Sequence, residues 1–128
     1  MGICLGMQLF MGSGTEGEPE SGLSYFAGSV ELLQRVSGLK LPHMGWNSLS
    51  RQDAHPLLEG LRPTADYYFA HSFVVRPEDP DVVVAITQHG QDFASVIARQ
   101  NVIGFQFHPE KSPPMGSRIL RRFLDWHP

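Results

Sequence analysis

The sequence predicts an α/β domain in which helices flank a β-sheet. Gly2–Gly6 has the form Gly-x-Cys-x-Gly, which is typical of a sharp turn from a strand into a helix. Such an elbow usually lies in the middle of a sheet with helices on both faces. Several short stretches rich in β-branched and aromatic residues follow in the second half, and an amphipathic segment ends the chain.

The first half of the chain has weak periodicity. Met1–Ile3 looks like the end of a strand, and Leu5–Met11 is expected to be helical because its apolar residues recur at helical spacing. Gly12–Ser24 is rich in Gly, Ser, Glu and Pro, which predicts a loop. Gly28–Val36 alternates weakly and is expected to be a strand, whereas Pro42–Asn47 is too irregular for either a helix or a strand.

The second half has clearer patterns. Runs of β-branched and aromatic residues predict strands at Tyr67–Val75, Asp81–Thr87, Phe93–Ala98 and Val102–Phe107. Gln88–Asp92 is expected to be the hairpin loop between two of them. Pro113 and Pro114 stop any strand, and Ser117 is a suitable N-cap for a helix over Arg118–Trp126. The apolar stripe of that helix consists of Ile119, Leu120, Phe123 and Leu124.

The strand that leads into the elbow is unusually short. Met1–Ile3 is the whole of it, whereas strands commonly have about five or six residues. Residues 1–128 are therefore expected to form the C-terminal part of a single larger domain, with the first half of its sheet missing. The alternative is a chain that begins at Met1 and borrows a partner for that edge.

Composition narrows the function classes. The net charge of −3 argues against a large nucleic-acid surface, and no apolar run approaches the ~20 residues that cross a bilayer. One cysteine and no secretion signal indicate a cytoplasmic protein. The six histidines show no close pair at metal-ligand spacing, and no phosphate-binding glycine loop is present. We therefore expect no metal, no nucleic acid and no membrane among its ligands and partners.

Three side chains suggest nucleophilic chemistry. Cys4 lies in the expected elbow, where a helix N-terminus favours the thiolate over the thiol. His108 and Glu110 stand two residues apart after the last expected strand, so their side chains point to the same side. Glu110 can then hold His108 in one tautomer while the other ring nitrogen faces the thiol.

This combination predicts acyl transfer through a thioester. Two structural alternatives stay open: Cys4 as a small core residue, and His108–Glu110 as a surface turn after a strand. The surface turn leaves unexplained why the only cysteine lies in an elbow.

Two motifs, Gly2–Gln8 (GICLGMQ) and Gly104–Glu110 (GFQFHPE), resemble those of the class I, or triad, glutamine amidotransferases. Pro42–Asn47 (PHMGWN), Tyr68–Phe73 (YFAHSF) and the extension Lys111-Ser112 are similar to the glutaminase subunits of imidazole glycerol phosphate synthases. The resemblance extends over essentially the whole chain. It implies a flavodoxin-like mixed sheet, glutamine as the substrate and no cofactor.

The resemblance also implies catalytic roles. Cys4 would attack the side-chain amide of glutamine, and His108 would take the thiol proton and deliver it to the departing ammonia. Glu110 would orient His108. The backbone N–H of Leu5, directly after the nucleophile, would be one oxyanion donor.

Further positions would bind the substrate. Gln8 and Glu16 match glutamine-binding positions of the family, and a carboxylate at Glu16 suits the α-ammonium group of glutamine. The backbone of His71, Ser72 and Phe73 would face the substrate carboxylate. The alternatives are that Glu16 is one acid among several in a loop, and that His71 is a buried histidine in an ordinary strand.

The resemblance implies a protein partner as well. Pro42–Asn47 would lie near a cyclase subunit, a (β/α)₈ barrel, with Trp46 and Lys111 as contact residues. Trp46 is alternatively a core residue. Ammonia released at Cys4 would pass through the barrel to a ribulosyl-aminoimidazole-carboxamide nucleotide, a step of histidine biosynthesis. In the family, residues before the elbow carry the first strands and part of the oxyanion hole.

Three other functions remain as alternatives. A class I amidotransferase of another pathway would keep the triad, although PHMGWN disfavours it. A cysteine peptidase or a redox-sensing cysteine protein would not need Gln8. An inactive remnant would bind the barrel subunit without any chemistry.

Overall fold

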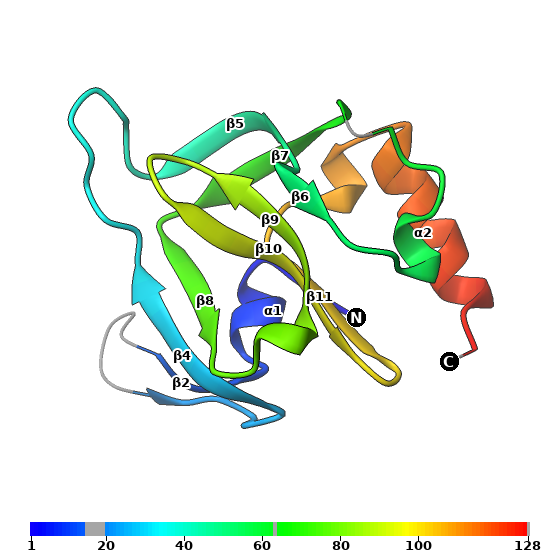
Figure 1. The fold of residues 1–128 in the computed structure, drawn as a ribbon, viewed down its shortest axis with the longest axis horizontal. Coiled ribbons are helices and arrows are strands. Elements are labelled where there is room, and N and C mark those ends of the chain that lie inside the picture. Colours follow the sequence, from blue (N-terminus) through cyan, green and yellow to red (C-terminus); the bar gives the residue numbers. More distant parts are fainter. Residues whose placement is uncertain (15–19, 63, 128) are drawn as a thin grey trace.

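The structure is a computed structural model that describes residues 1–14, 20–62 and 64–127. Within these residues the strands form three sheets, which Figure 1 shows with the short helix α1 among them and α2 at one end. The strand orders are β1-β11-β10-β9-β6, β3-β2-β4-β8 and β5-β7. The predicted α/β class with a mixed sheet is confirmed.

The five-stranded sheet carries the elbow. β1 runs parallel to β11, with Gly2 opposite Gly104 and Ile3 opposite Phe105. β10 is antiparallel to both of its neighbours, β11 and β9. The strands of this sheet are β1 (Gly2–Ile3), β6 (Arg51–Gln52), β9 (Val83–Gln88), β10 (Asp92–Arg99) and β11 (Val102–Phe105).

Most of this sheet was predictable. The expected strand Phe93–Ala98 is confirmed inside β10, and the hairpin loop between Gln88 and Asp92 is confirmed. Gly90 has a φ of 73° in that loop, a conformation that favours glycine. β9 starts at Val83, later than predicted, because Pro80–Val82 forms the 3₁₀ turn η2.

Part of the four-stranded sheet occupies sequence that predicted a loop, whereas its strand Phe26–Leu32 overlaps the expected strand Gly28–Val36. Gly12–Ser24 contains most of β2 and all of β3, so the loop prediction is wrong there. Small polar residues carry little strand signal of their own, and parallel pairing of β2 with β4 supplies the backbone hydrogen bonds instead. The strands are β2 (Met11–Gly14), β3 (Glu20–Ser21), β4 (Phe26–Leu32) and β8 (Phe73–Pro77).

The two-stranded sheet corrects two further predictions. Pro42–Asn47 was expected to be irregular but lies largely in β5 (His43–Ser48), which pairs with β7 (Asp66–His71) along its whole length. Only His43 of β5 is buried, so the strand shows no apolar alternation. The predicted single strand Tyr67–Val75 is broken at Ser72, whose carbonyl accepts from Leu33 N at 2.8 Å. β7 and β8 therefore belong to different sheets.

The helices also differ from the prediction. α1 covers only Leu5–Gln8 because Met11 already pairs in β2. α2 (Met115–Asp125) begins at Pro114 as its N-cap and not at Ser117. Leu124 is 79% exposed, so it is not part of the buried stripe, which includes Met115 and Ile119. Among the described residues no helix is long and apolar enough to cross a membrane.

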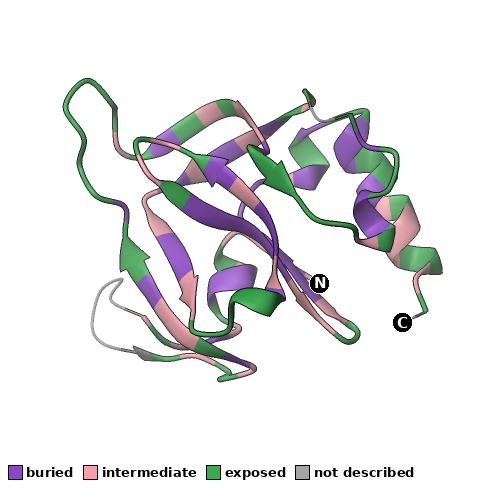
Figure 2. Ribbon diagram, in the orientation of Figure 1, coloured by how far each residue is buried: buried purple, intermediate pink, exposed green. Residues whose placement is uncertain are grey.

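The buried hydrophobic side chains form two groups. Figure 2 shows buried residues along β9, β10 and α1 and on the inner side of α2. The larger group lies against α2 and the 3₁₀ turns η1 (Pro56–Leu58) and η3 (Pro109–Lys111), and it includes Tyr67, Phe69, Phe105, Phe107 and Ile119. The smaller group lies around α1 and includes Met7, Met11, Phe26, Val75 and Ile97.

Candidate active site

Cys4 occupies a strained turn between β1 and α1. Its backbone has φ 51° and ψ −107°, a conformation that costs a non-glycine residue about 1–3 kcal/mol. The turn is held because Cys4 N donates to Phe105 O at 2.7 Å, and because Met7 N and Gln8 N donate to Cys4 O at 3.0 and 3.2 Å. The predicted elbow is confirmed as backbone geometry.

The two glycines of the elbow have different roles. A Cβ at Gly2 would lie 2.6 Å from the carbonyl carbon of Gly6, so the turn can close only with glycine there. A Cβ at Gly6 would meet nothing within 4 Å outside its own turn. Close packing therefore requires glycine at position 2 but not at position 6. Gly104 has a further role, because a Cβ there would lie 2.7 Å from Met7 Cγ, and α1 packs directly on β11.

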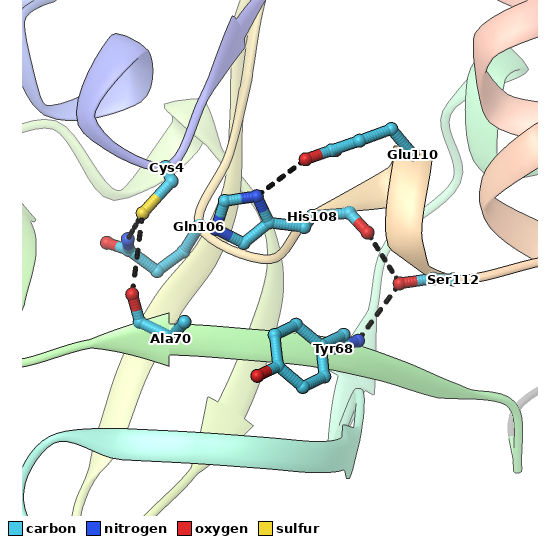
Figure 3. Close-up of polar contacts among 7 residues, drawn as sticks. All are labelled: Cys4, Tyr68, Ala70, Gln106, His108, Glu110 and Ser112. Carbon is cyan, nitrogen blue, oxygen red and sulfur yellow. Dashed lines mark hydrogen bonds and ion pairs between the residues drawn. The ribbon is translucent and has the colours of Figure 1, made fainter.

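His108 and Glu110 form an ion-pair contact beside the elbow. Glu110 Oε1 lies 2.7 Å from His108 Nδ1, and the imidazole is 18% exposed. A carboxylate at this distance accepts from Nδ1–H, which leaves Nε2 without a proton when the ring is neutral. In Figure 3 the ring of His108 lies between Glu110 and Cys4.

Ser112 holds the histidine segment against β7. Its hydroxyl donates to His108 O at 2.6 Å and accepts from Tyr68 N at 2.9 Å, and His108 N donates to Tyr68 O at 2.8 Å. Ser112 is buried. Sequence reasoning missed this role, although Ser112 was part of the extension that supports the resemblance.

The thiol has neighbours that sequence reasoning missed. Cys4 Sγ lies 3.8 Å from Ala70 O, to which it donates, and 3.7 Å from Gln106 Nε2, which donates to the sulfur (Figure 3). Gln8 Nε2 in turn donates to Gln106 Oε1 at 3.3 Å and to Phe73 O at 3.1 Å. The only signal for Gln106 was its place two residues before His108, on the same side of the chain.

The backbone of His71, Ser72 and Phe73, which was predicted to face the substrate carboxylate, lies at the break between β7 and β8. Ser72 is the break itself, and the carbonyl of Phe73 contacts Gln8. His71 is buried, and its Nδ1 lies 2.8 Å from Phe73 O, so Nδ1 carries the proton. The side chain of His71 therefore takes part in the protein's own hydrogen bonding.

A second histidine completes this network. His43 Nδ1 lies 3.0 Å from His71 Nε2, and Asn47 Nδ2 donates to His43 Nε2 at 3.2 Å. Since His71 Nε2 carries no proton, His43 Nδ1 is the donor, and both rings are neutral. The histidines show no close pair at ligand spacing along the sequence, but the register of β5 on β7 sets His43 opposite His71 in space.

Burial keeps both rings neutral. It is the main cause that lowers the pKa of His43 from 6.5 to about 3, with smaller contributions from His71 and His89. Burial also lowers the pKa of His71 from 6.5 to about 4, against the hydrogen bond to Phe73 O, which raises it. His89 stacks on His43 with ring centroids 4.1 Å apart.

The predicted partner-contact residues lie on one surface. Trp46 is 58% exposed and packs edge-on against Tyr68, with ring centroids 5.8 Å apart. Lys111 Nζ lies 5.6 Å from the centroid of the same Tyr68 ring. Met44, on β5, is also exposed. Trp46 is therefore not a core residue. We call the surface formed by Trp46, Lys111, Tyr68 and Met44 the aromatic surface.

A hollow of about 170 Å³ lies beside α1. Its lining includes Leu5 and Gln8 together with residues on both sides of the segment that contains Glu16, namely Ser13, Gly14, Ser21 and Gly22. Glu16 itself lies outside the described residues. The structure thus brings Cys4, Gln8, Phe73 and His108 together, whereas Trp46 lies on the aromatic surface.

The sequence is similar to that of known proteins over nearly its whole length. The family model described as glutamine amidotransferase class-I matches residues 1–126. Imidazole glycerol phosphate synthase subunit HisH of Rhodospirillum rubrum is 45% identical over 100% of this chain and 61% of its own length. The subunit of the same name from Thermosynechococcus vestitus is 48% identical over 97% of this chain and 60% of its own length.

The fold has a counterpart among solved structures. A candidate GMP synthase subunit from Thermoplasma acidophilum matches with a TM-score of 0.69 over 97% of this chain and 54% of its own, at 20% identity. That likeness concerns the fold alone. The chain spans about 60% of the length of the two HisH proteins compared above.

Proposed function

This chain belongs to the glutamine amidotransferase class-I family, and we propose that it supplies the glutaminase chemistry of an imidazole glycerol phosphate synthase. The observation that carries the proposal is an elbow cysteine beside a His108–Glu110 pair, in a chain 45% identical to a synthase subunit over its whole length. The pathway would be histidine biosynthesis, in the cytoplasm.

The proposed reaction starts at the thiol. Cys4 passes its proton to Nε2 of His108, and the sulfur attacks the side-chain amide carbon of glutamine. Leu5 N–H, which directly follows the nucleophile at the start of α1, stabilises the oxyanion. His108 then gives the proton to the departing ammonia, and water hydrolyses the thioester to release glutamate. Glu110 holds the imidazole in the required tautomer.

Glutamine would bind next to α1. Gln8 and Leu5 line the hollow, and the backbone around Ser72 reaches α1 through the contact between Gln8 and Phe73. Glu16 would pair with the α-ammonium group of glutamine. The backbone of His71, Ser72 and Phe73 would face the substrate carboxylate.

The ammonia would be consumed by a cyclase subunit bound at the aromatic surface. Trp46 and Lys111 contact the same ring of Tyr68, and Trp and Tyr are enriched among the residues that anchor protein interfaces. Tyr68 also contacts His108 through the backbone. A partner on this surface would therefore lie next to the histidine that handles the proton.

The test uses the intact protein with its cyclase partner. Cys4→Ala and Cys4→Ser are expected to abolish glutamine-dependent synthesis and to spare synthesis driven by added ammonium salt, because only the glutaminase step needs the thiol. Glutamate release is measured in parallel. Glutamine hydrolysis that survives Cys4→Ala would show that the triad assignment is wrong.

The same assays separate the alternatives. A peptidase would cleave peptide substrates and release no glutamate from free glutamine. An inactive remnant would bind the cyclase partner without any hydrolysis. An amidotransferase of another pathway would hydrolyse glutamine but would not be stimulated by the cyclase partner with its nucleotide.

A further inference from the structure

Gln106 is brought to the nucleophile by strand pairing. β1 and β11 are parallel, with Ile3 opposite Phe105 at their ends. The residues that follow these strands, Cys4 and Gln106, therefore lie next to each other. Cys4 N donates to Phe105 O at 2.7 Å, and Gln106 N donates to Ser95 O at 2.9 Å. Gln106 is completely buried. Its position is therefore set by backbone bonds on both sides.

The orientation of its amide follows from a chain of hydrogen bonds. Phe73 O can only accept, so the atom of Gln8 that lies 3.1 Å from it must be the amide nitrogen. That nitrogen also lies 3.3 Å from Gln106, which must then present its oxygen. The nitrogen of Gln106 is left to face Cys4 Sγ at 3.7 Å. Gln8 thus fixes Gln106 as a donor to sulfur.

This donor matters most when the thiol ionises. The neutral thiol can donate to Ala70 O at 3.8 Å, but once the proton leaves, that carbonyl faces a negative sulfur and repels it. We propose that Gln106 stabilises the Cys4 thiolate through its side-chain N–H, with Gln8 as the residue that positions it. The proposal rests on the proposed function, since a stabilised thiolate serves a cysteine that attacks a carbonyl.

The proton balance is simple. The S–H bond breaks, the proton moves to Nε2 of His108, and the electron pair stays on sulfur, where the N–H of Gln106 contacts it. Other titratable groups near this site are His71 at the end of β7, and Glu110, which contacts His108. Neither takes over the contact of Gln106 with the sulfur, so loss of the amide should make the thiolate harder to form.

The test measures alkylation of Cys4 by iodoacetamide in the intact protein, followed by mass spectrometry of the Cys4 peptide between about pH 5 and about pH 10. Gln106→Met keeps the length of the side chain but removes the donor. Its alkylation midpoint is expected to rise by about one pH unit, and the rate at neutral pH to fall about tenfold. Gln106→Glu keeps the size and the polar character, and it should raise the midpoint further because a carboxylate repels the thiolate.

Gln34→Met is the matched control, because it makes the same chemical change at an exposed position and should leave the midpoint unchanged. Circular dichroism identifies the variants that are folded. An unchanged midpoint in a folded Gln106 variant would overturn the proposal. A wild-type protein that hydrolyses no glutamine would instead refute the proposed function, while the Gln106 comparison could still be read from alkylation.

Discussion

At the scale of single residues, the elbow depends on close packing that only one of its glycines provides. Gly2 touches the start of α1, where any side chain would overlap Gly6 and Phe10. Cys4 can hold its strained backbone only if that contact is made, because strain at a nucleophile has to be balanced by the surrounding structure. The geometry of the elbow is therefore set two residues before the cysteine.

The two glycines give a matched pair of variants. Gly2→Ala places a Cβ 2.6 Å from the carbonyl atoms of Gly6 and from Phe10 Cε2, so it should lower the free energy of unfolding by about 1–3 kcal/mol. Gly6→Ala meets no such contact and gains helix propensity of up to about 1 kcal/mol. Urea denaturation measures both. Equal destabilisation by the two variants would contradict this account of the elbow.

At the scale of elements, β7 connects the parts of the site. Its carbonyl at Ala70 faces the thiol, and Tyr68 bonds to both His108 and Ser112 through its backbone. On its other side, His71 joins β7 to β5 through His43. One strand thus supports the nucleophile, the histidine segment and the aromatic surface at once.

The His43–His71 pair predicts a loss of stability in mild acid. Both residues have a pKa of 6.5 when unfolded and of about 3 and about 4 when folded, so the unfolded chain binds more protons between these limits. The stability is fully present above pH 6.5 and falls as the pH drops from there toward 4. At pH ~5, protonation of each histidine in the unfolded chain should lower the free energy of unfolding by about 2 kcal/mol.

Urea denaturation at about pH 7.5 and about pH 5 checks this prediction. His43→Phe keeps the stacking of the ring on Phe69 and His89 and should make stability less dependent on pH. His127→Gln, a change at an exposed position, should keep the full dependence. A pH dependence in His43→Phe equal to that of the wild type would show that the pair is not the cause.

At the scale of the whole molecule, the site faces two directions. On one side is the hollow beside α1, lined by Leu5 and Gln8, where glutamine is proposed to bind. The aromatic surface lies over β5 and β7, where Trp46 and Lys111 meet at Tyr68. His108 contacts the backbone of Tyr68, so it lies between these two regions.

The aromatic surface predicts an interface phenotype. Trp46→Ala or Lys111→Ala should weaken binding of the proposed cyclase partner by about tenfold or more, and should reduce its stimulation of glutamine hydrolysis. The control is Leu124→Ala, which truncates an apolar side chain that is 79% exposed on α2. Titration calorimetry and the glutaminase assay provide the readouts. Unchanged binding and unchanged stimulation in both variants would rule out this contact surface.

Local patterns in the sequence were sufficient for several features. The Gly-x-Cys-x-Gly turn predicted the elbow, and β-branched runs predicted β10 and β11. The spacing of His108 and Glu110 predicted their contact, because residues two apart lie on one side of an extended chain. Their catalytic roles stay predictions, as does the view that residues 1–128 are the C-terminal part of a single domain.

Only the tertiary structure decided the features that depend on partners far away in the chain. β5 is a strand because β7 pairs with it, and the break at Ser72 occurs because β7 and β8 pair with different neighbours. Gln106 is a donor to sulfur because Phe73 O orients Gln8, and His43 meets His71 through strand register. Sequence periodicity reports which side of the chain a residue faces, whereas these contacts depend on which segment lies on that side.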